Sequence, residues 1–171
     1  MKTILYLVRH GETIDNANHI MQGQVQGELN SIGWEQAAQL SRQLSAVHFD
    51  AIIASDLKRA IDTSVIIAKP HHLQVKTTAL LRERDWGSFT GRYIPDLRGL
   101  PFPDDVEPME QLMQRARDFL SLIRCQYPDK QVLAVGHGIV NKAIQAVHYG
   151  KAMNEVERMT NCEVRILQLQ E

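Results

Sequence analysis

The chain contains few cysteines, few aromatic residues and no long apolar segment. Its two cysteines, Cys125 and Cys162, lie far apart, and neither belongs to a cluster of cysteines and histidines. We therefore expect reduced thiols, as in cytoplasmic proteins, rather than a disulfide framework or a metal site. The apolar run at residues 4–8 is too short for the core of a signal peptide. No segment approaches the roughly 18 apolar residues of a membrane span.

The chain also has almost no net charge. Its 19 lysines and arginines are balanced by 20 acidic residues, which gives a net charge of −1. This balance provides no overall attraction for nucleic acid or a membrane, so we expect neither as a partner and expect any anion site to be local. The length of 171 residues fits one domain, 1–171. No heptad pattern indicates an oligomeric state.

Apolar runs typical of strands alternate with segments of helical period. The expected strands are about 3–9, 51–54, 73–77, 132–135 and 162–169. The expected helices are about 31–47, 56–68, 108–126 and 138–148. Asn30 is a suitable N-cap for the first helix, and Ser55 with Asp56 for the second. The alternation predicts a three-layer α/β/α sandwich with a mainly parallel central sheet, and the last segment alternates like an edge strand.

Residues 84–107 differ from the rest of the chain in their weak periodicity. Loops of this length in compact domains usually serve a function, often as lids. The segment contains four aromatic residues, a type in which disordered segments are poor. These residues are Trp86, Phe89, Tyr93 and Phe102. We therefore predict that 84–107 forms a small cap over the functional site.

The most informative segment is residues 7–13, where an apolar run ends at an Arg–His–Gly sequence. The run predicts a buried strand, and Arg9 and His10 follow it directly. Open α/β sheets carry their active sites at the carboxyl ends of the strands. Arg9 is therefore a candidate to bind an anion, and His10 is a candidate nucleophile.

Three further segments place reactive side chains at the ends of predicted elements. Arg59 lies in the first turn of a helix, where free backbone N–H groups favour phosphate. Glu83 lies between two arginines just before the predicted cap, and His137 lies between two glycines directly after a strand. Each feature alone is common in ordinary turns and caps, so it is their joint occurrence that is informative.

In this order, the segments resemble the signature of the histidine phosphatase superfamily, the phosphoglycerate mutase-like proteins, and in particular its compact bacterial phosphatases. The resemblance extends from about residue 3 to 148. The first segment resembles the nucleophile motif, and it continues through Asn16 and the Gln22–Gly23 pair. Glu83 falls on the position of the catalytic acid, and the residues around His137 resemble the second-histidine motif.

The resemblance implies a metal-independent phosphomonoesterase that hydrolyses a small phosphorylated metabolite and needs no cofactor. His10 would attack phosphorus through one ring nitrogen and form a phosphohistidine, while its other ring nitrogen donates to a backbone carbonyl near Gly11. Glu83 would protonate the leaving oxygen and then act as a base toward water.

The phosphoryl oxygens would be bound by donors that are in place before the reaction. Arg9 and Arg59 supply permanently charged, planar donors. His137, expected to be protonated, supplies a third positive donor. The other predicted substrate-binding residues are Thr13, Asn16, Gln22, Gly23 and Gly138.

Several members of the family remain possible. Cofactor-dependent phosphoglycerate mutases have larger insertions, which exclude water and retain the intermediate. The short cap here therefore favours a phosphatase. The alternatives are such a mutase, a protein phosphohistidine phosphatase and a non-catalytic relative that binds phosphorylated ligands. Four arginines of the cap region could bind a second acidic group of a substrate or pair with neighbouring aspartates. They are Arg82, Arg84, Arg92 and Arg98.

Overall fold

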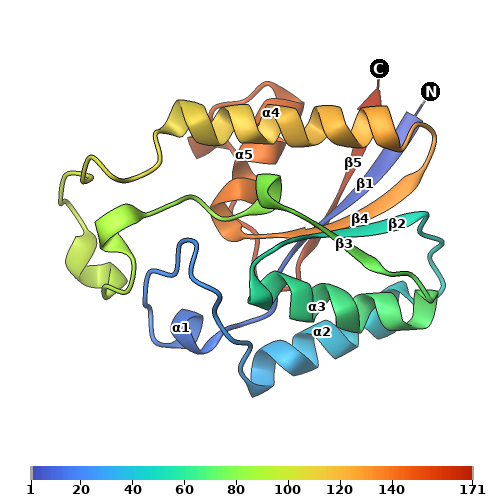
Figure 1. The fold of residues 1–171 in the computed structure, drawn as a ribbon, viewed down its shortest axis with the longest axis horizontal. Coiled ribbons are helices and arrows are strands. Elements are labelled where there is room, and N and C mark those ends of the chain that lie inside the picture. Colours follow the sequence, from blue (N-terminus) through green and yellow to red (C-terminus); the bar gives the residue numbers. More distant parts are fainter. Residues whose placement is uncertain (1, 171) are drawn as a thin grey trace.

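The computed structural model describes residues 2–170, which form a five-stranded sheet with helices on both faces (Figure 1). The strands are β1 (Lys2–Arg9), β2 (Ala51–Ser55), β3 (Val75–Thr78), β4 (Gln131–Gly136) and β5 (Val164–Gln170). Their order is β3-β2-β4-β1-β5. Neighbouring strands are parallel except for β1 and β5, which are antiparallel. The predicted fold class is confirmed, and β5 is an edge strand as expected.

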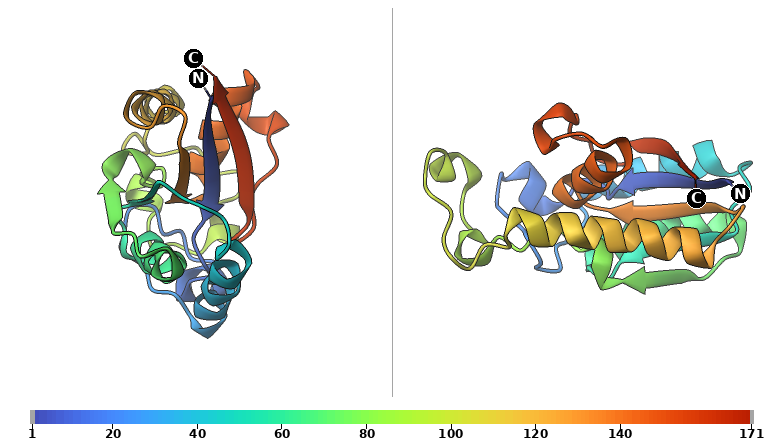
Figure 2. Two further views of the ribbon diagram at one scale, coloured as in Figure 1. Left: turned by 90° about the vertical axis from the view of Figure 1, so that its right-hand side faces the viewer. Right: turned by 90° about the horizontal axis from the view of Figure 1, so that it is seen from above.

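The helices form two outer layers. These layers consist of α2 (Ser31–Leu44), α3 (Lys58–Ala68), α4 (Met109–Gln126) and α5 (Gly138–Tyr149), while the short α1 (Ile14–Ala17) lies in the loop that follows β1. Helices α4 and α5 cover one face of the sheet, and α2 and α3 cover the other (Figure 1). The views in Figure 2 show the same layers, with the two ends of the chain side by side because β1 and β5 pair along their length.

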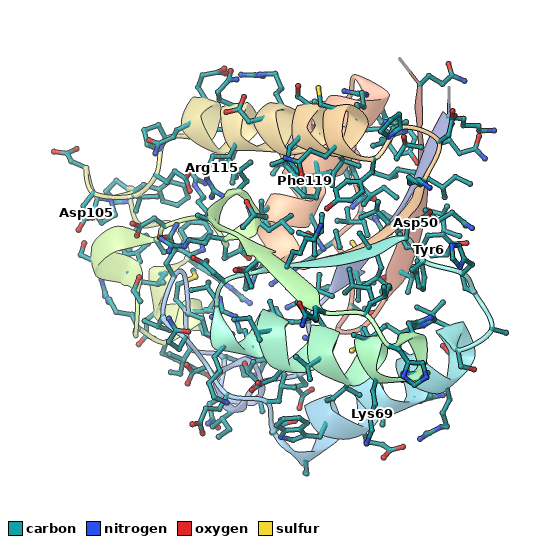
Figure 3. All side chains as sticks on the ribbon, turned by 45° about the vertical axis from the view of Figure 1, so that its right-hand side comes forward. Tyr6, Asp50, Lys69, Asp105, Arg115 and Phe119 are labelled. Carbon is teal, nitrogen blue, oxygen red and sulfur yellow. The ribbon has the colours of Figure 1, made fainter. Side chains whose placement is uncertain are left out.

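The alternation of side chains along β1 divides the apolar residues between two cores. Leu5 and Leu7 pack with α4 and α5, whereas Val8 packs with α2 and α3. Phe119 points from α4 into the first core and is fully buried (Figure 3). Burial of each such side chain contributes about 1.5–3 kcal/mol. The continuous apolar runs of the central strands are explained by the helices on both faces.

Helix α2 begins as predicted but ends earlier. The side chain of Asn30 accepts a hydrogen bond from the N–H of Gly33 at 2.8 Å, which confirms its capping role. The helix ends at Leu44 rather than near residue 47. The hydroxyl of Ser45 donates to the carbonyl of Arg42 at 2.8 Å, a local bond that competes with further helical hydrogen bonding.

The predicted cap of α3 is wrong. The N-cap residue is Leu57, and no side chain caps the helix. Ser55 instead ends β2, and its hydroxyl oxygen accepts the N–H of Leu57 at 3.2 Å. Asp56 forms an ion pair with Arg82 at 2.7 Å. Ser55 is therefore used in a local turn before the helix, and Asp56 in a tertiary contact that the local sequence does not reveal.

The remaining boundaries lie close to the expected ones. Strand β3 begins two residues later than expected, at Val75, and α4 begins directly after Pro108. Within residues 2–170, no helix is long and apolar enough to cross a membrane.

The strands β1, β2 and β4 end on the same side of the molecule, because they are parallel. Residues 84–107 lie beyond this edge, in the yellow-green part at the left of Figure 1. They contain two short 3₁₀ turns, Gly87–Phe89 and Ile94–Leu97. A single β-bridge joins Tyr93 to Ile20, so this segment is attached to the loop that follows β1.

Candidate active site

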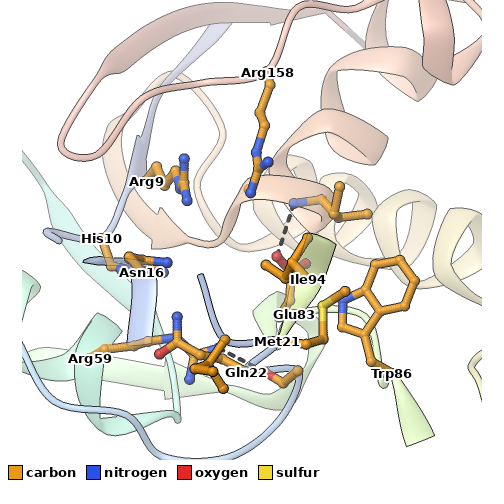
Figure 4. A pocket seen from close by; sticks show the side chains of 14 residues that line it. Arg9, His10, Asn16, Met21, Gln22, Arg59, Glu83, Trp86, Ile94 and Arg158 are labelled. Carbon is orange, nitrogen blue, oxygen red and sulfur yellow. Dashed lines mark hydrogen bonds between the residues drawn. The ribbon is translucent and has the colours of Figure 1, made fainter. Parts of the chain in front are cut away.

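A cavity of about 140 Å³ lies at the carboxyl ends of the central strands (Figure 4). It brings together residues from β1, the loop after it, α3, the segment after β3 and the start of α5. The ionisable groups in its wall, apart from His10, are three arginines and one carboxylate. They are Arg9, Arg59, Arg158 and Glu83. An excess of positive charge in an enclosed space makes this cavity suited to an anion.

His10 is held with one ring nitrogen bound and the other available. Its Nδ1 lies 2.7 Å from the carbonyl oxygen of Gly11, which fixes the proton on that nitrogen and leaves a lone pair on Nε2. The neighbouring chain is packed closely, since a side chain on Gly11 would meet the carbonyl oxygen of Gly33 at 2.6 Å. Burial, together with the charges of Arg59 and Arg9, lowers the pKa of His10 well below its ordinary value. The ring is therefore neutral and nucleophilic at neutral pH.

Arg59 and Arg9 are buried cations with unused donors. Arg59 is 1% exposed, and its terminal nitrogens donate to the carbonyls of Gly23 and Gln26. Arg9 donates to the carbonyl of Met159 at 2.8 Å. The Nε atoms of both arginines are buried and have no partner within the described residues. Burial lowers the pKa of each to about 10, so both remain charged at neutral pH.

His137 lies beside His10 and is completely buried, with the two ring centres 5.1 Å apart. Its Nε2 lies 2.8 Å from Ser55 Oγ, while its Nδ1 has no partner among residues 2–170. Burial, followed by the charge of Arg59, lowers the pKa of His137 well below its ordinary value. In the protein without ligand, the lowered pKa disfavours the expected protonated form of His137, because a third positive charge beside two buried arginines is costly.

Glu83 is positioned by the first turn of α5. Its carboxylate accepts the N–H groups of Ile139 and Val140, both at 3.0 Å, and that of Arg84 at 2.9 Å. The dashed line that ends at Glu83 in Figure 4 marks one of these bonds. Free N–H groups at a helix N-terminus favour a negative charge there. The predicted acid, Glu83, is therefore hydrogen-bonded to the backbone of the helix that directly follows His137.

The segment that carries Glu83 is fixed from α4 by Arg115. This guanidinium donates to the carbonyls of Leu80 and Arg82, at 3.0 and 2.9 Å, and forms an ion pair with Glu107 at 2.8 Å. Glu107 in turn accepts the N–H of Asp85 at 3.1 Å. Arg115, labelled in Figure 3, therefore connects both ends of residues 82–107 to the rigid layer of α4. The sequence predicts only which residues of α4 face the core, so the role of Arg115 in fixing this segment was missed.

The predicted substrate-binding residues divide into two groups. Asn16, Gln22, Gly23 and Gly138 line the cavity. Thr13 does not: its hydroxyl accepts the N–H of Asn16 at 2.9 Å and donates to Gln22 Oε1 at 3.0 Å. Thr13 therefore caps the short helix α1 and holds the two residues that do line the cavity.

The cap arginines are not in the cavity wall. Arg82 is paired with Asp56, and Arg84 lies over the rings of Trp86 and Phe102, at 5.0 and 5.2 Å. Arg92 lies over another ring of the same segment. Two residues that sequence reasoning missed lie at the site instead. Arg158 lines the cavity, and Asn161 donates to the backbone carbonyl of His10 at 3.0 Å.

No three acidic, histidine or cysteine side chains come together within residues 2–170 in the way that a metal ion requires. The charged donors of the site are instead guanidinium groups and backbone N–H groups. A neutral imidazole with a free nitrogen, buried cationic donors and one carboxylate in the same cavity define a site for phosphoryl transfer.

Comparison with known proteins agrees with this geometry. The family model of the histidine phosphatase superfamily (branch 1) matches residues 5–171. A metal-independent phosphoserine phosphatase of Arabidopsis thaliana is 34% identical, over 89% of this chain and 73% of the relative. The uncharacterized phosphatase PhoE of Bacillus subtilis is also 34% identical, over 83% of this chain and 75% of PhoE. The chain therefore belongs to the histidine phosphatase superfamily, and it is a phosphatase of that superfamily.

Solved structures show the same fold. A mycobacterial glucosyl-3-phosphoglycerate phosphatase superposes with a TM-score of 0.86 and is 26% identical, and the match covers 98% of this chain and 91% of that one. Bacillus stearothermophilus YhfR superposes with a TM-score of 0.90 at 28% identity, over 96% of this chain and 90% of that one.

Proposed function

We propose that the protein is a metal-independent phosphomonoesterase that hydrolyses a small phosphorylated metabolite through a phosphohistidine at His10. The observation that carries this proposal is the set of buried donors without partners around one neutral imidazole. The Nε atoms of Arg9 and Arg59 and the Nδ1 atom of His137 are buried and unpaired within the described residues. An unpaired buried donor costs about 1–3 kcal/mol, and more if it is charged, so such a set indicates that a ligand completes it. A phosphoryl group offers the oxygens that these donors lack.

In the first step, the Nε2 lone pair of His10 attacks phosphorus and the bond between phosphorus and the leaving oxygen breaks. Glu83 transfers its proton to that oxygen, so the product leaves as a neutral alcohol. The bond from His10 Nδ1 to the carbonyl of Gly11 holds the ring in the reactive orientation. Arg9 and Arg59 bind the phosphoryl oxygens and stabilise the charge of the transition state.

In the second step, Glu83 accepts a proton from water, and the water oxygen attacks phosphorus. The N–P bond breaks, which restores neutral His10 and releases inorganic phosphate. Glu83 regains its proton in this step, so the enzyme returns to its starting state. The N–H groups of α5 and the carbonyls held by Arg115 keep Glu83 in one position through both steps.

The size of the cavity supports a small substrate. Pockets for drug-sized ligands have volumes of roughly 300–1,000 Å³, and this cavity has about 140 Å³. We propose that residues 84–107 act as a cap, since Trp86 and Ile94 of this segment contribute to the cavity wall. A cytoplasmic location is also part of the proposal, because both cysteines are free thiols, as expected in a reducing compartment.

The proposal is tested by phosphate release from a panel of phosphorylated metabolites after treatment of the enzyme with EDTA. We expect turnover by the EDTA-treated wild type and none by His10→Asn, with the fold of the variant checked by circular dichroism. Phosphoryl transfer between 3- and 2-phosphoglycerate is measured in parallel. Predominant transfer would make the protein a mutase, and loss of activity with EDTA would contradict the metal-independent mechanism.

A further inference from the structure

We propose that Arg158 binds a carboxylate of the substrate, so that the site selects small phosphomonoesters carrying a carboxylate close to the phosphoryl group. This proposal rests on the proposed function, because it describes the second half of the same substrate. Arg158 lies in the segment between α5 and β5 and reaches the cavity between Arg9 and Glu83 in the view of Figure 4.

Arg158 lies close to Arg9 at the start of α5. A side chain on Gly138 would lie 3.3 Å from Arg158 Nε and 3.5 Å from Arg9 Nε. The two guanidinium groups therefore both lie beside Gly138, which places no side chain between them. An anion that extends over Gly138 can contact both arginines.

Arg158 has no acidic partner in the part of the chain from 2 to 170. The ion pairs formed there use other arginines, and Arg158 takes part in none of them. The charge of Arg158 contributes to the lowered pKa of Arg9, second only to burial. Glu83 and Glu163 offset part of this repulsion at Arg9, and water screens part of it because Arg158 is exposed. A bound anion in contact with both guanidinium groups would offset the rest.

The charge of the cavity indicates the charge of the ligand. Arg9, Arg59 and Arg158 supply three positive charges, while His10 and His137 are neutral. When Glu83 carries the proton that it gives to the leaving oxygen, these three charges have no counterion in the cavity wall. A phosphoryl dianion neutralises two of them. One further negative charge on the substrate, as in a carboxylate, neutralises the third.

The other candidates for this role are occupied. Arg82 is paired with Asp56, and Arg84 is stacked on aromatic rings and donates to the carbonyl of Glu107. The wall on the cap side is apolar, with Met21, Ile94 and Trp86. Arg158 is thus the cation in the cavity wall that remains after the phosphoryl group is bound by Arg9 and Arg59.

The test compares substrates that differ only in the carboxylate. One pair is 3-phosphoglycerate and glycerol 3-phosphate, and the other is O-phosphoserine and O-phosphoethanolamine. We expect the wild type to prefer the carboxylate member of at least one pair by about tenfold to a hundredfold in kcat/KM, the range for one charge-assisted hydrogen-bonded contact. In Arg158→Gln this preference should fall toward one, mainly through a higher KM for the acid.

Lys151→Gln is the matched control. Lys151 lies in the same segment and is exposed, and its removal changes the net charge equally without altering the cavity wall. The preference should be kept in this variant. A wild type without preference in either pair, or an Arg158→Gln variant that loses both members equally, would overturn the proposal. Hydrolysis of p-nitrophenyl phosphate by the same samples separates this outcome from failure of the phosphatase assignment, in which no substrate is turned over.

Discussion

The Nε2 atom of His137 lies 2.8 Å from the hydroxyl oxygen of Ser55, although the two residues are 82 positions apart. Ser55 ends β2, and His137 follows β4, the neighbouring strand. Ser55 Oγ accepts the N–H of Leu57, and its hydroxyl proton has no acceptor among the described residues other than His137 Nε2. We infer that His137 carries its proton on Nδ1, the atom that has no protein partner, and thus presents a neutral donor to a phosphoryl oxygen.

Ser55→Ala should therefore change the tautomer of His137 and slow the reaction. We expect kcat to fall by about tenfold, the value of one neutral hydrogen bond of about 1–1.5 kcal/mol. Nitrogen-15 NMR should show the proton on Nδ1 of His137 in the wild type and a mixture of tautomers in the variant. Ser64→Ala, which removes a buried hydroxyl in α3 away from the cavity, should leave the His137 signals unchanged. A wild-type proton on Nε2 would show that this inference is wrong.

Glu83→Gln should separate substrates by the quality of their leaving groups. Glutamine has nearly the same shape but no acidic proton to give. We expect kcat for alkyl phosphates to fall by about 10²–10⁴-fold. The decrease for p-nitrophenyl phosphate should be much smaller, since nitrophenolate leaves without protonation. An equal decrease for both substrates would mean that Glu83 serves binding or folding and not proton transfer.

The buried histidines should make stability depend on pH below about 6.5. His10 and His137 have pKa values well below the ordinary 6.5 when folded. In this range the unfolded chain binds protons that the folded chain does not, so the free energy of unfolding decreases as the pH falls below 6.5. Each histidine contributes up to about 1.4 kcal/mol per pH unit. Urea denaturation at several pH values measures the slope.

The matched variants for this measurement are His10→Asn and His137→Asn. Each should remove part of the slope, since an asparagine does not titrate. Unchanged slopes in both variants would place the pH dependence in other groups and contradict the neutral state of the two rings.

Gly33→Ala should destabilise the loop that follows His10. A side chain at this position would lie 2.0 Å from the carbonyl oxygen of Glu12, so the backbone must move. We expect a loss of about 1–3 kcal/mol in the free energy of unfolding, as for other overpacked sites. Gly91→Ala is the comparison, because it has a positive φ but no atom within 4 Å. It should cost about 1–2 kcal/mol through backbone strain alone and should leave the chemistry at His10 intact. If Gly33→Ala and Gly91→Ala changed kcat/KM equally, the close-packing argument would be contradicted.

The strands and the motif residues could be predicted from sequence because both depend on local patterns. The run at residues 4–8 is apolar because β1 is covered on both faces, and Arg9 and His10 directly follow it. The orientation of His10 toward the carbonyl of Gly11 could be predicted as well, since it follows from the chemistry of the nucleophile.

The features that were missed depend on contacts between distant residues. Arg158 lies about 150 positions from Arg9 and in a segment without a recognisable pattern. Helix α1 has only four residues and is stabilised by the reciprocal bonds of Thr13 and Asn16. The charge state of His137 depends on complete burial beside two arginines, which no local motif reveals.

The most direct test of the account is to trap the phosphoenzyme. EDTA-treated wild-type enzyme is mixed with ³²P-labelled substrate in a rapid-quench instrument and stopped with base, in which phosphohistidine is stable. We predict that label appears on the protein within one turnover, that peptide mapping places it on His10, and that His10→Asn shows none. Steady phosphate release by the wild type with no labelled protein at any time point, or label on another residue, would contradict the central claim.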